Sequence, residues 1–222
     1  MPALESASAS TPAGRGVPRT GAVPGPLYLS MQKRILVIMG HPGTQSFCAS
    51  LADAYVQGAT DAGHAVQRID VRDLVFDPIL HEGYRQIQAL EPDLLAAQQA
   101  LKEADHLVFI YPTWWGGMPA LLKGFFDRVL LPGFAFKYRA NSVWWDKYLT
   151  GKSAHVLTTM DTPPWYFRLF YRNPGNNQMR RTILEFCGIR PVRITCIGRV
   201  HNAPASWTAR WLDKAAAFGR RA

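Results

Sequence analysis

The protein has 222 residues, of which 48% are hydrophobic, and 25 Lys and Arg against 16 Asp and Glu give it a formal net charge of +9. This length is sufficient for one α/β domain with a sizeable core. Three widely spaced cysteines give neither a disulfide framework nor a metal-ligand spacing, and no apolar run has transmembrane length. These features favour a reduced, cytoplasmic protein without a metal.

The basic charge could face nucleic acid, a membrane surface or anionic small molecules. No Lys/Arg-rich block extends beyond Arg180-Arg181 and Arg220-Arg221. An unspecialised basic surface therefore explains the charge as well as a nucleic-acid role does, and we expect no nucleic-acid partner.

The chain opens with residues 1–30, which are rich in Ala, Pro, Ser, Gly and Thr and lack periodic apolar residues. This composition predicts a disordered leader, and without an apolar core segment it is not a secretory signal. Met31 lies directly before the first predicted strand and is a candidate natural start. We therefore expect the folded domain to cover residues 31–222 and to form without the leader.

Short β-branched apolar runs predict strands, and apolar residues at three- to four-residue spacing predict helices. The first half of the chain contains a strand at 35–39, a helix from Phe47 to about Gly63, a strand at 66–71, a long connection at 72–90, a helix at 90–104 and a strand at 107–110. A loop at 111–119 and a helix at 120–129 follow.

The second half starts with an aromatic segment at 131–150, which we expect to be irregular and to cover one edge of the site or form an interface. Then come a strand at 153–159, an aromatic loop at 160–176, a helix from Met179 to Gly188, a strand at 192–197 and a helix at 207–218. Strands that alternate with helices indicate a parallel sheet covered on both faces. We predict a flavodoxin-like, doubly wound five-stranded sheet of order 2-1-3-4-5.

The loop Tyr111-Pro112-Thr113-Trp114-Trp115-Gly116-Gly117-Met118-Pro119 has an unusual composition for the end of a buried strand. Its glycines permit close backbone approach to a flat ligand, and its two indoles suit an aromatic ring. A buried tryptophan pair followed by a glycine turn explains the same residues equally well when the loop is considered alone.

In the predicted sheet order, the loops at 40–47, 111–119 and 158–173 converge at the switch point between the first and third strands. The first loop brings Thr44 and Ser46 to a helix N-terminus, where amides and the helix dipole favour an anion, and His41 adds a donor. Ser46 as a plain N-cap remains the simpler explanation of that residue alone. A phosphate end beside an aromatic, glycine-lined end fits a flavin, whose ring would take hydrogen bonds from amides at 114–117.

Three segments resemble the flavodoxin-fold NAD(P)H:quinone oxidoreductase family, which includes bacterial quinone reductases, modulator-of-drug-activity proteins and ancillary proteins of potassium efflux systems. They are Gly40-His41-Pro42 with Ser46-Phe47, then Ala104 through Arg128, and Thr158-Thr159 with Phe186-Cys187-Gly188. The resemblance implies a bound flavin, FMN or FAD, with NAD(P)H as substrate. By this resemblance the cofactor-binding residues are His41, Thr44, Ser46, Phe47, Cys48, Pro112, Thr113, Trp114, Trp115, Gly116, Thr158, Thr159, Met160 and Asp161.

The resemblance also places Tyr166 at the flavin edge, as a catalytic residue, and Arg172 where the family often has His. Arg172 would supply positive charge but could not shuttle a proton. Further departures are Met160-Asp161 in place of Gly-Gly and Cys48 in place of Asn. Cys48 near a helix N-terminus is either a thiol of lowered pKa or a small buried residue, and we favour the second.

The implied function is ping-pong transfer of hydride from NAD(P)H through the flavin to a quinone or similar acceptor. One alternative is a flavin-binding regulatory subunit on a membrane transporter of the potassium-efflux type, and another is a flavin redox sensor without quinone turnover. The resemblance also implies a homodimer, to which the aromatic segment at 131–150 would contribute.

Overall fold

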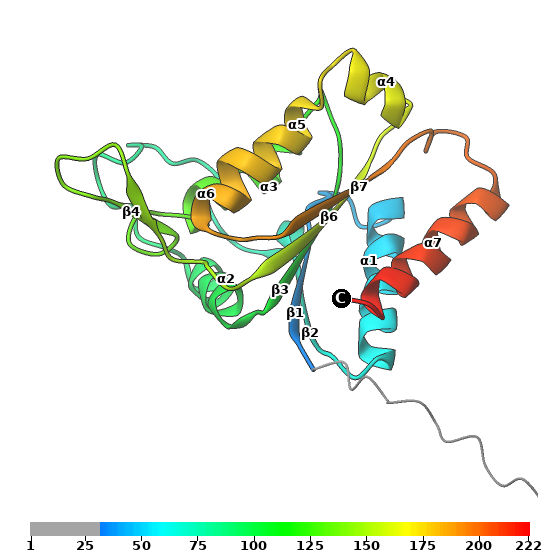
Figure 1. The fold of residues 1–222 in the computed structure, drawn as a ribbon, viewed down its shortest axis with the longest axis horizontal. Helices are drawn as coiled ribbons and strands as arrows, with labels where there is room; N and C mark the ends of the chain where they lie inside the picture. Colours follow the sequence, from blue (N-terminus) through cyan, green and yellow to red (C-terminus); the bar gives the residue numbers. More distant parts are fainter. Residues whose placement is uncertain (1–31) are drawn as a thin grey trace, which may run out of the picture. The chain divides into compact units, whose positions relative to one another are not determined.

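The computed structural model describes residues 32–222, so the predicted leader and Met31 lie outside the described residues. A five-stranded parallel sheet has the order β2-β1-β3-β6-β7 (Figure 1). Its members are β1 (Arg34–Met39), β2 (Ala65–Asp70), β3 (His106–Pro112), β6 (Ser153–Thr159) and β7 (Val192–Ile197). Numbered among themselves, these strands have the predicted order 2-1-3-4-5, which confirms the flavodoxin-like fold.

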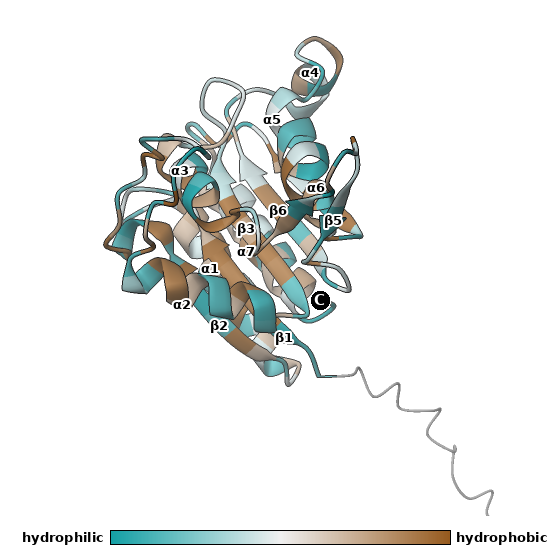
Figure 2. Ribbon diagram, turned by 90° about the vertical axis from the view of Figure 1, so that its left-hand side faces the viewer, coloured by the Kyte–Doolittle hydropathy of each residue, from teal (hydrophilic) through white to brown (hydrophobic). Residues whose placement is uncertain are grey.

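Helices cover both faces of this sheet because alternate strand residues point to opposite sides. Val37 and Val108 pack with α1 (Phe47–Asp61) and α7 (Ala205–Gly219). Leu36 and Phe109 face the other core, with α2 (Pro92–Glu103), α3 (Ala120–Val129), the π-helical segment η2 (Gln178–Leu184) and α6 (Glu185–Cys187). Figure 2 shows the apolar strands β1, β3 and β6 between these layers.

Two segments expected to be irregular contain regular structure. The aromatic segment at 131–150 forms a two-stranded antiparallel sheet of β4 (Phe136–Tyr138) and β5 (Trp145–Lys147). Its aromatic side chains explain the ordering, since the Trp145 indole stacks on Phe186 at 4.5 Å and donates to the Phe186 carbonyl at 2.9 Å. The loop at 160–176 contains the short helices α4 (Pro164–Leu169) and α5 (Pro174–Asn177), each with proline in its first turn, where the missing N–H costs nothing.

The long connection after β2 starts with the 3₁₀ turn η1 (Val71–Asp73) and then lacks regular structure up to α2. It is held by Arg128, whose fully buried side chain donates to the Glu91 carboxylate at 2.8 Å and to the Ala89 and Asp77 carbonyls. Among residues 32–222, no helix combines the length and apolarity needed to cross a membrane.

Candidate functional site

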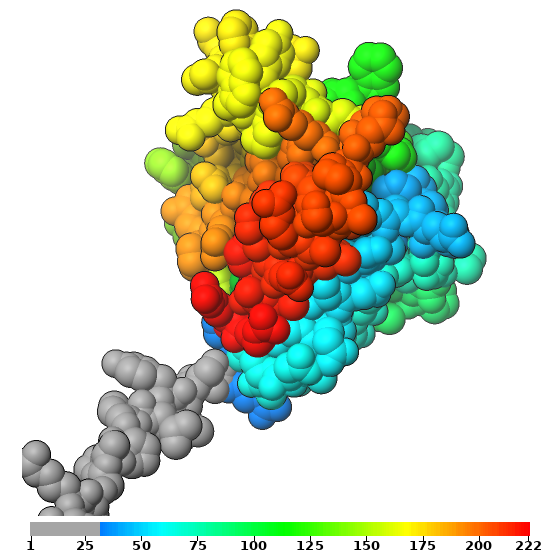
Figure 3. Space-filling view, turned by 90° about the vertical axis from the view of Figure 1, so that its right-hand side faces the viewer, coloured from blue at the N-terminus to red at the C-terminus, as the bar shows by residue number. Residues whose placement is uncertain are grey.

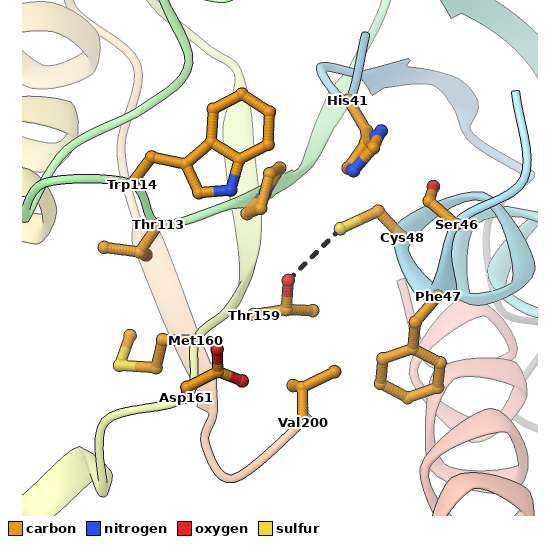
Figure 4. A pocket seen from close by; sticks show the side chains of 11 residues that line it. His41, Ser46, Phe47, Cys48, Thr113, Trp114, Thr159, Met160, Asp161 and Val200 are labelled. Carbon is orange, nitrogen blue, oxygen red and sulfur yellow. Dashed lines mark hydrogen bonds between the residues drawn. The ribbon is translucent and has the colours of Figure 1, made fainter. Parts of the chain in front are cut away.

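Two adjoining cavities open at the carboxyl ends of β1, β3 and β6, where open α/β sheets bind ligands. The first has a volume of about 200 Å³ and is lined by His41, Ser46, Phe47, Cys48, Pro112, Thr113, Trp114, Thr159, Met160, Asp161 and Val200 (Figure 4). The second has a volume of about 510 Å³ and is lined by Thr113, Trp115, Gly116, Met160, Asp161, Thr162, Phe167, Tyr171 and Pro174. Because both cavities share Thr113, Met160 and Asp161, they form one two-part site.

The N-terminus of α1 opens into the first cavity. Ser46 caps the helix, its hydroxyl accepting a hydrogen bond from the Ala49 amide at 3.1 Å. The amides of Phe47 and Cys48 occupy the first two helical positions, where no intrahelical acceptor exists. These donors and the positive end of the helix dipole form an anion-binding end.

His41 lies at the same end and has a defined tautomer. The Gly43 amide donates to His41 Nδ1 at 2.8 Å, so in the neutral ring the proton is on Nε2. The imidazole also packs edge-on against Trp114, with ring centroids 5.7 Å apart. Arg72 fixes this loop from outside by donating to the Gly43 carbonyl at 2.6 Å. His41 is thus held with one N–H available.

Cys48 is buried at the base of the first cavity. Its Sγ lies 3.3 Å from Thr159 Oγ1, the contact drawn as a dashed line in Figure 4. Burial raises the pKa of this thiol to about 11, although the hydrogen bond with Thr159 acts in the opposite direction. The thiol is therefore neutral at physiological pH, and the helix N-terminus does not create a thiolate here.

Residues 114–117 form a tight two-residue turn. The Trp114 amide donates to the Gly117 carbonyl at 2.9 Å, and the Gly117 amide donates to the Trp114 carbonyl at 3.0 Å. The central residues Trp115 and Gly116 have positive φ values of 51° and 78°. We expected amides throughout 114–117 to face a ligand, but the turn itself uses two of them. Only the Trp115 and Gly116 amides remain candidates.

The two indoles have different environments. Trp114 is 45% exposed and forms a wall of the first cavity, whereas Trp115 is fully exposed at the second. The alternative explanation of this loop, a buried tryptophan pair, is therefore wrong. The turn presents both rings instead of burying them, because its left-handed backbone directs the Trp115 side chain away from the core.

Several residues expected at the site lie beside it. Thr44 is exposed and lines neither cavity, while Thr158 is completely buried with Oγ1 lacking a hydrogen-bond partner. Tyr166 stacks on Phe170 at 4.5 Å, and Arg172 is exposed with a left-handed backbone. Neither of these two belongs to the lining of either cavity.

The sequence predicted that aromatic residues of 160–173 would form walls of the pocket, but it did not identify the other lining residues individually. Tyr171 supplies the phenol of the second cavity, and Phe167, Thr162 and Pro174 complete its wall. Val200 closes the first cavity from the loop after β7. The available signal was the aromatic richness of 160–173. It does not indicate which of the rings line the second cavity, because that depends on the helical backbone of α4.

The model of the family described as flavodoxin-like fold matches residues 33–218. An uncharacterized NAD(P)H oxidoreductase of Haemophilus influenzae is 30% identical over 172 residues, covering 75% of this chain and 84% of that one. The chain belongs to the flavodoxin-like NAD(P)H:quinone oxidoreductase family. It is therefore an oxidoreductase.

Further proteins resemble this oxidoreductase over most of its length. Rat NAD(P)H dehydrogenase [quinone] 1 is 26% identical over 198 residues, 78% of this chain and 71% of that one. A Streptococcus mutans protein of known structure superimposes with a TM-score of 0.72 and 30% identity, covering 85% of this chain and all of the other. In this oxidoreductase, the two-part cavity thus occupies the ligand-binding edge of the family fold.

Proposed function

We propose that this oxidoreductase binds a flavin, FMN or FAD, in the two-part cavity and transfers hydride from NAD(P)H to a quinone-like acceptor in a ping-pong order. The observation that supports this function best is the continuity of an anion-binding helix N-terminus with a wider, aromatic-walled cavity. A flavin nucleotide has a phosphate-bearing chain and a flat ring system, so it would need two such ends joined at a neck. Here the neck is formed by the residues that both cavities share, Thr113, Met160 and Asp161.

The residues present fit such a cofactor. At the narrow end, Ser46, the first amides of α1 and His41 Nε2–H provide donors for a phosphate. The nearby Cys48 thiol is neutral and adds no repelling charge, although Asp161 lines the neck with an exposed carboxylate. At the wide end, the Trp115 and Gly116 amides provide donors for ring atoms.

A bound flavin would supply the two-electron chemistry by accepting hydride from NAD(P)H and delivering it to the acceptor. The protein's own residues would position the flavin and the substrates and shield them from water. Trp114 and Pro112 wall the phosphate end, while Tyr171, Phe167 and Trp115 surround the wider part, which the flavin ring and the substrates would share. Because these walls belong to one cavity, NAD(P)H and the acceptor would have to use it in turn.

The proposal is tested by identifying the cofactor and measuring turnover. The purified protein should carry or take up a flavin with the absorption spectrum of a bound isoalloxazine, and should oxidise NADH or NADPH steadily when benzoquinone is added. A protein that takes up neither FMN nor FAD would contradict the proposal. Flavin binding without quinone turnover would instead support the transporter-subunit or sensor role.

A further inference from the structure

A cluster of exposed aromatic and aliphatic side chains lies on the α4 tip, which we define as residues 163–172. Trp165, Leu169 and Phe170 are 58%, 66% and 63% exposed. Figure 3 shows this segment in yellow, projecting from the rest of the domain. Clusters of large apolar side chains on a protein surface usually mark a contact with a protein or membrane.

The α4 tip itself contains arginines and no acidic residue, and the nearest acidic residue before it in sequence is Asp161. Between residues 162 and 212 the sequence contains eight arginines and one acidic residue, Glu185. Arg168 and Arg172 lie within the tip itself, and both are exposed. None of the side-chain ion pairs found among residues 32–222 involves these two guanidinium groups. The tip therefore combines exposed aromatic rings with uncompensated positive charge.

The α4 tip is also built onto the mouth of the second cavity. Phe167 is buried and anchors α4 while lining that cavity, and the neighbouring Tyr171 lines it from the exposed end. The fully exposed Trp115 stands on the same rim. A surface that covers the tip would thus lie next to the opening through which the second cavity is reached.

We propose that the α4 tip docks this protein on an anionic lipid bilayer. Aromatic rings settle at the headgroup level of a bilayer, and arginines beside them meet lipid phosphates. An anionic bilayer matches both the rings and the charge, whereas a purely apolar protein groove would leave the arginines unpaired. If the proposed function is correct, the docked cavity would open toward lipophilic quinones dissolved in the bilayer.

Docking is tested by co-sedimentation of the full chain with vesicles of phosphatidylcholine alone and of phosphatidylcholine mixed with phosphatidylglycerol. The wild type should sediment with the mixed vesicles, and added salt should release it. Arg168→Gln should weaken partitioning roughly fivefold, the effect of one arginine at an anionic surface. Leu169→Ser and Trp165→Ser should also weaken it, through lost insertion.

Matched controls come from exposed residues away from the tip. Leu95→Ser on α2 and Arg85→Gln in the connection after β2 make the same chemical changes, and both should sediment like the wild type. No binding to mixed vesicles, or an equal loss in the controls, would overturn the proposal. So would conversion of a dimer to a monomer by Leu169→Ser, because a second copy of the chain would then cover the tip.

Delivery of quinones from the bilayer to the cavity is tested by a separate measurement of quinone reduction. With NAD(P)H, Leu169→Ser should reduce a long-chain quinone in mixed vesicles more slowly than the wild type and reduce water-soluble benzoquinone at the wild-type rate. Equal rates with the long-chain quinone would contradict delivery from the bilayer. Failure of the wild type to reduce benzoquinone would contradict the proposed function, while sedimentation would still decide docking.

Discussion

Gly175 and Gly116 are in direct backbone contact: the Gly175 amide donates to the Gly116 carbonyl at 2.8 Å. A Cβ on residue 175 would lie 2.4 Å from that oxygen, closer than real Cβ atoms approach. The start of α5 thus supports the turn that carries Trp115, and the turn needs glycine at position 175 although this residue lines neither of the two site cavities.

Gly175→Ala should therefore displace the 114–117 turn and weaken flavin binding. Overpacking of this kind costs about 1–3 kcal/mol, or roughly tenfold to a hundredfold in affinity if it falls on the bound state. Titration of the protein with FMN and FAD measures the effect. Gly117→Ala is the matched control, because nothing lies within 4 Å of its Cβ position and its φ is not left-handed. Equal affinities in both variants would contradict the supporting role of Gly175.

Tyr171 should affect turnover more than Tyr166 does. The family resemblance assigned the phenol to Tyr166, but Tyr171 is the tyrosine that lines the second cavity. Tyr171→Phe removes one donor near the reacting groups and should lower NAD(P)H-dependent quinone reduction about tenfold, with flavin affinity nearly unchanged. Tyr166→Phe keeps its stacking on Phe170 and should stay within about twofold of the wild type. The reverse order of effects would restore the assignment to Tyr166.

Cys48 should resist alkylation in the folded protein. Burial keeps its thiol protonated at neutral pH, with a pKa of about 11, and only the thiolate reacts rapidly. Native protein treated with iodoacetamide at pH 7.5 should show no label on the Cys48 peptide by mass spectrometry, whereas protein unfolded in guanidinium should be fully labelled there. Rapid labelling of the native protein would mean that the thiol is more acidic or more exposed than its place against Thr159 indicates.

The free energy of unfolding should fall as the pH drops below about 6.5. Tyr55 links the buried rings of His106 and His155, and burial lowers their pKa values to about 4 and about 3. An unfolded histidine has a pKa of about 6.5, so between pH 6.5 and 4 the unfolded chain binds protons that the native state excludes. Each histidine then costs up to about 1.4 kcal/mol of unfolding free energy per pH unit.

Urea unfolding at pH 7.5, 6, 5 and 4.5 would measure this slope, with His201→Gln as a control at an exposed histidine. The control should retain the slope of the wild type. A free energy of unfolding that stays constant from pH 6.5 to 4.5 would show that the two histidines are protonated in the native state or open to solvent.

The dimer implied by the family resemblance remains a prediction, and the β4–β5 hairpin is its candidate surface. Tyr138 and Trp144 are 61% and 67% exposed on this hairpin. Light scattering at micromolar concentration should give the mass of two chains, and Trp144→Ser should shift the equilibrium toward one. A monomeric wild type with flavin bound would contradict the prediction.

The sheet could be predicted because its signals are local. Each strand is a short β-branched run bounded by turn residues, and alternation sorts Leu36 and Val37 to opposite faces. The β4–β5 hairpin could not be predicted, since its three-residue strands are ordered by contact with Phe186, which lies about forty residues away in sequence.

The cavity could be predicted only in part for a similar reason. His41, Ser46 and Thr159 follow from the sheet order, which brings their loops together. The exposure of Trp115 depends on a left-handed backbone that its residue type does not favour. The place of Tyr171 on the wall of the second cavity depends on the end of α4, which is too short to give a periodic signature in the sequence.

Thr113, Met160 and Asp161 belong to both parts of the cavity. A substitution at any of them changes the phosphate end and the wider, substrate-accessible part together. Variants selected for a new electron acceptor should therefore accumulate at Phe167, Tyr171 and Trp115, which border only the wider part. A substitution of Met160 that alters the preference for the electron acceptor would also change the affinity for flavin.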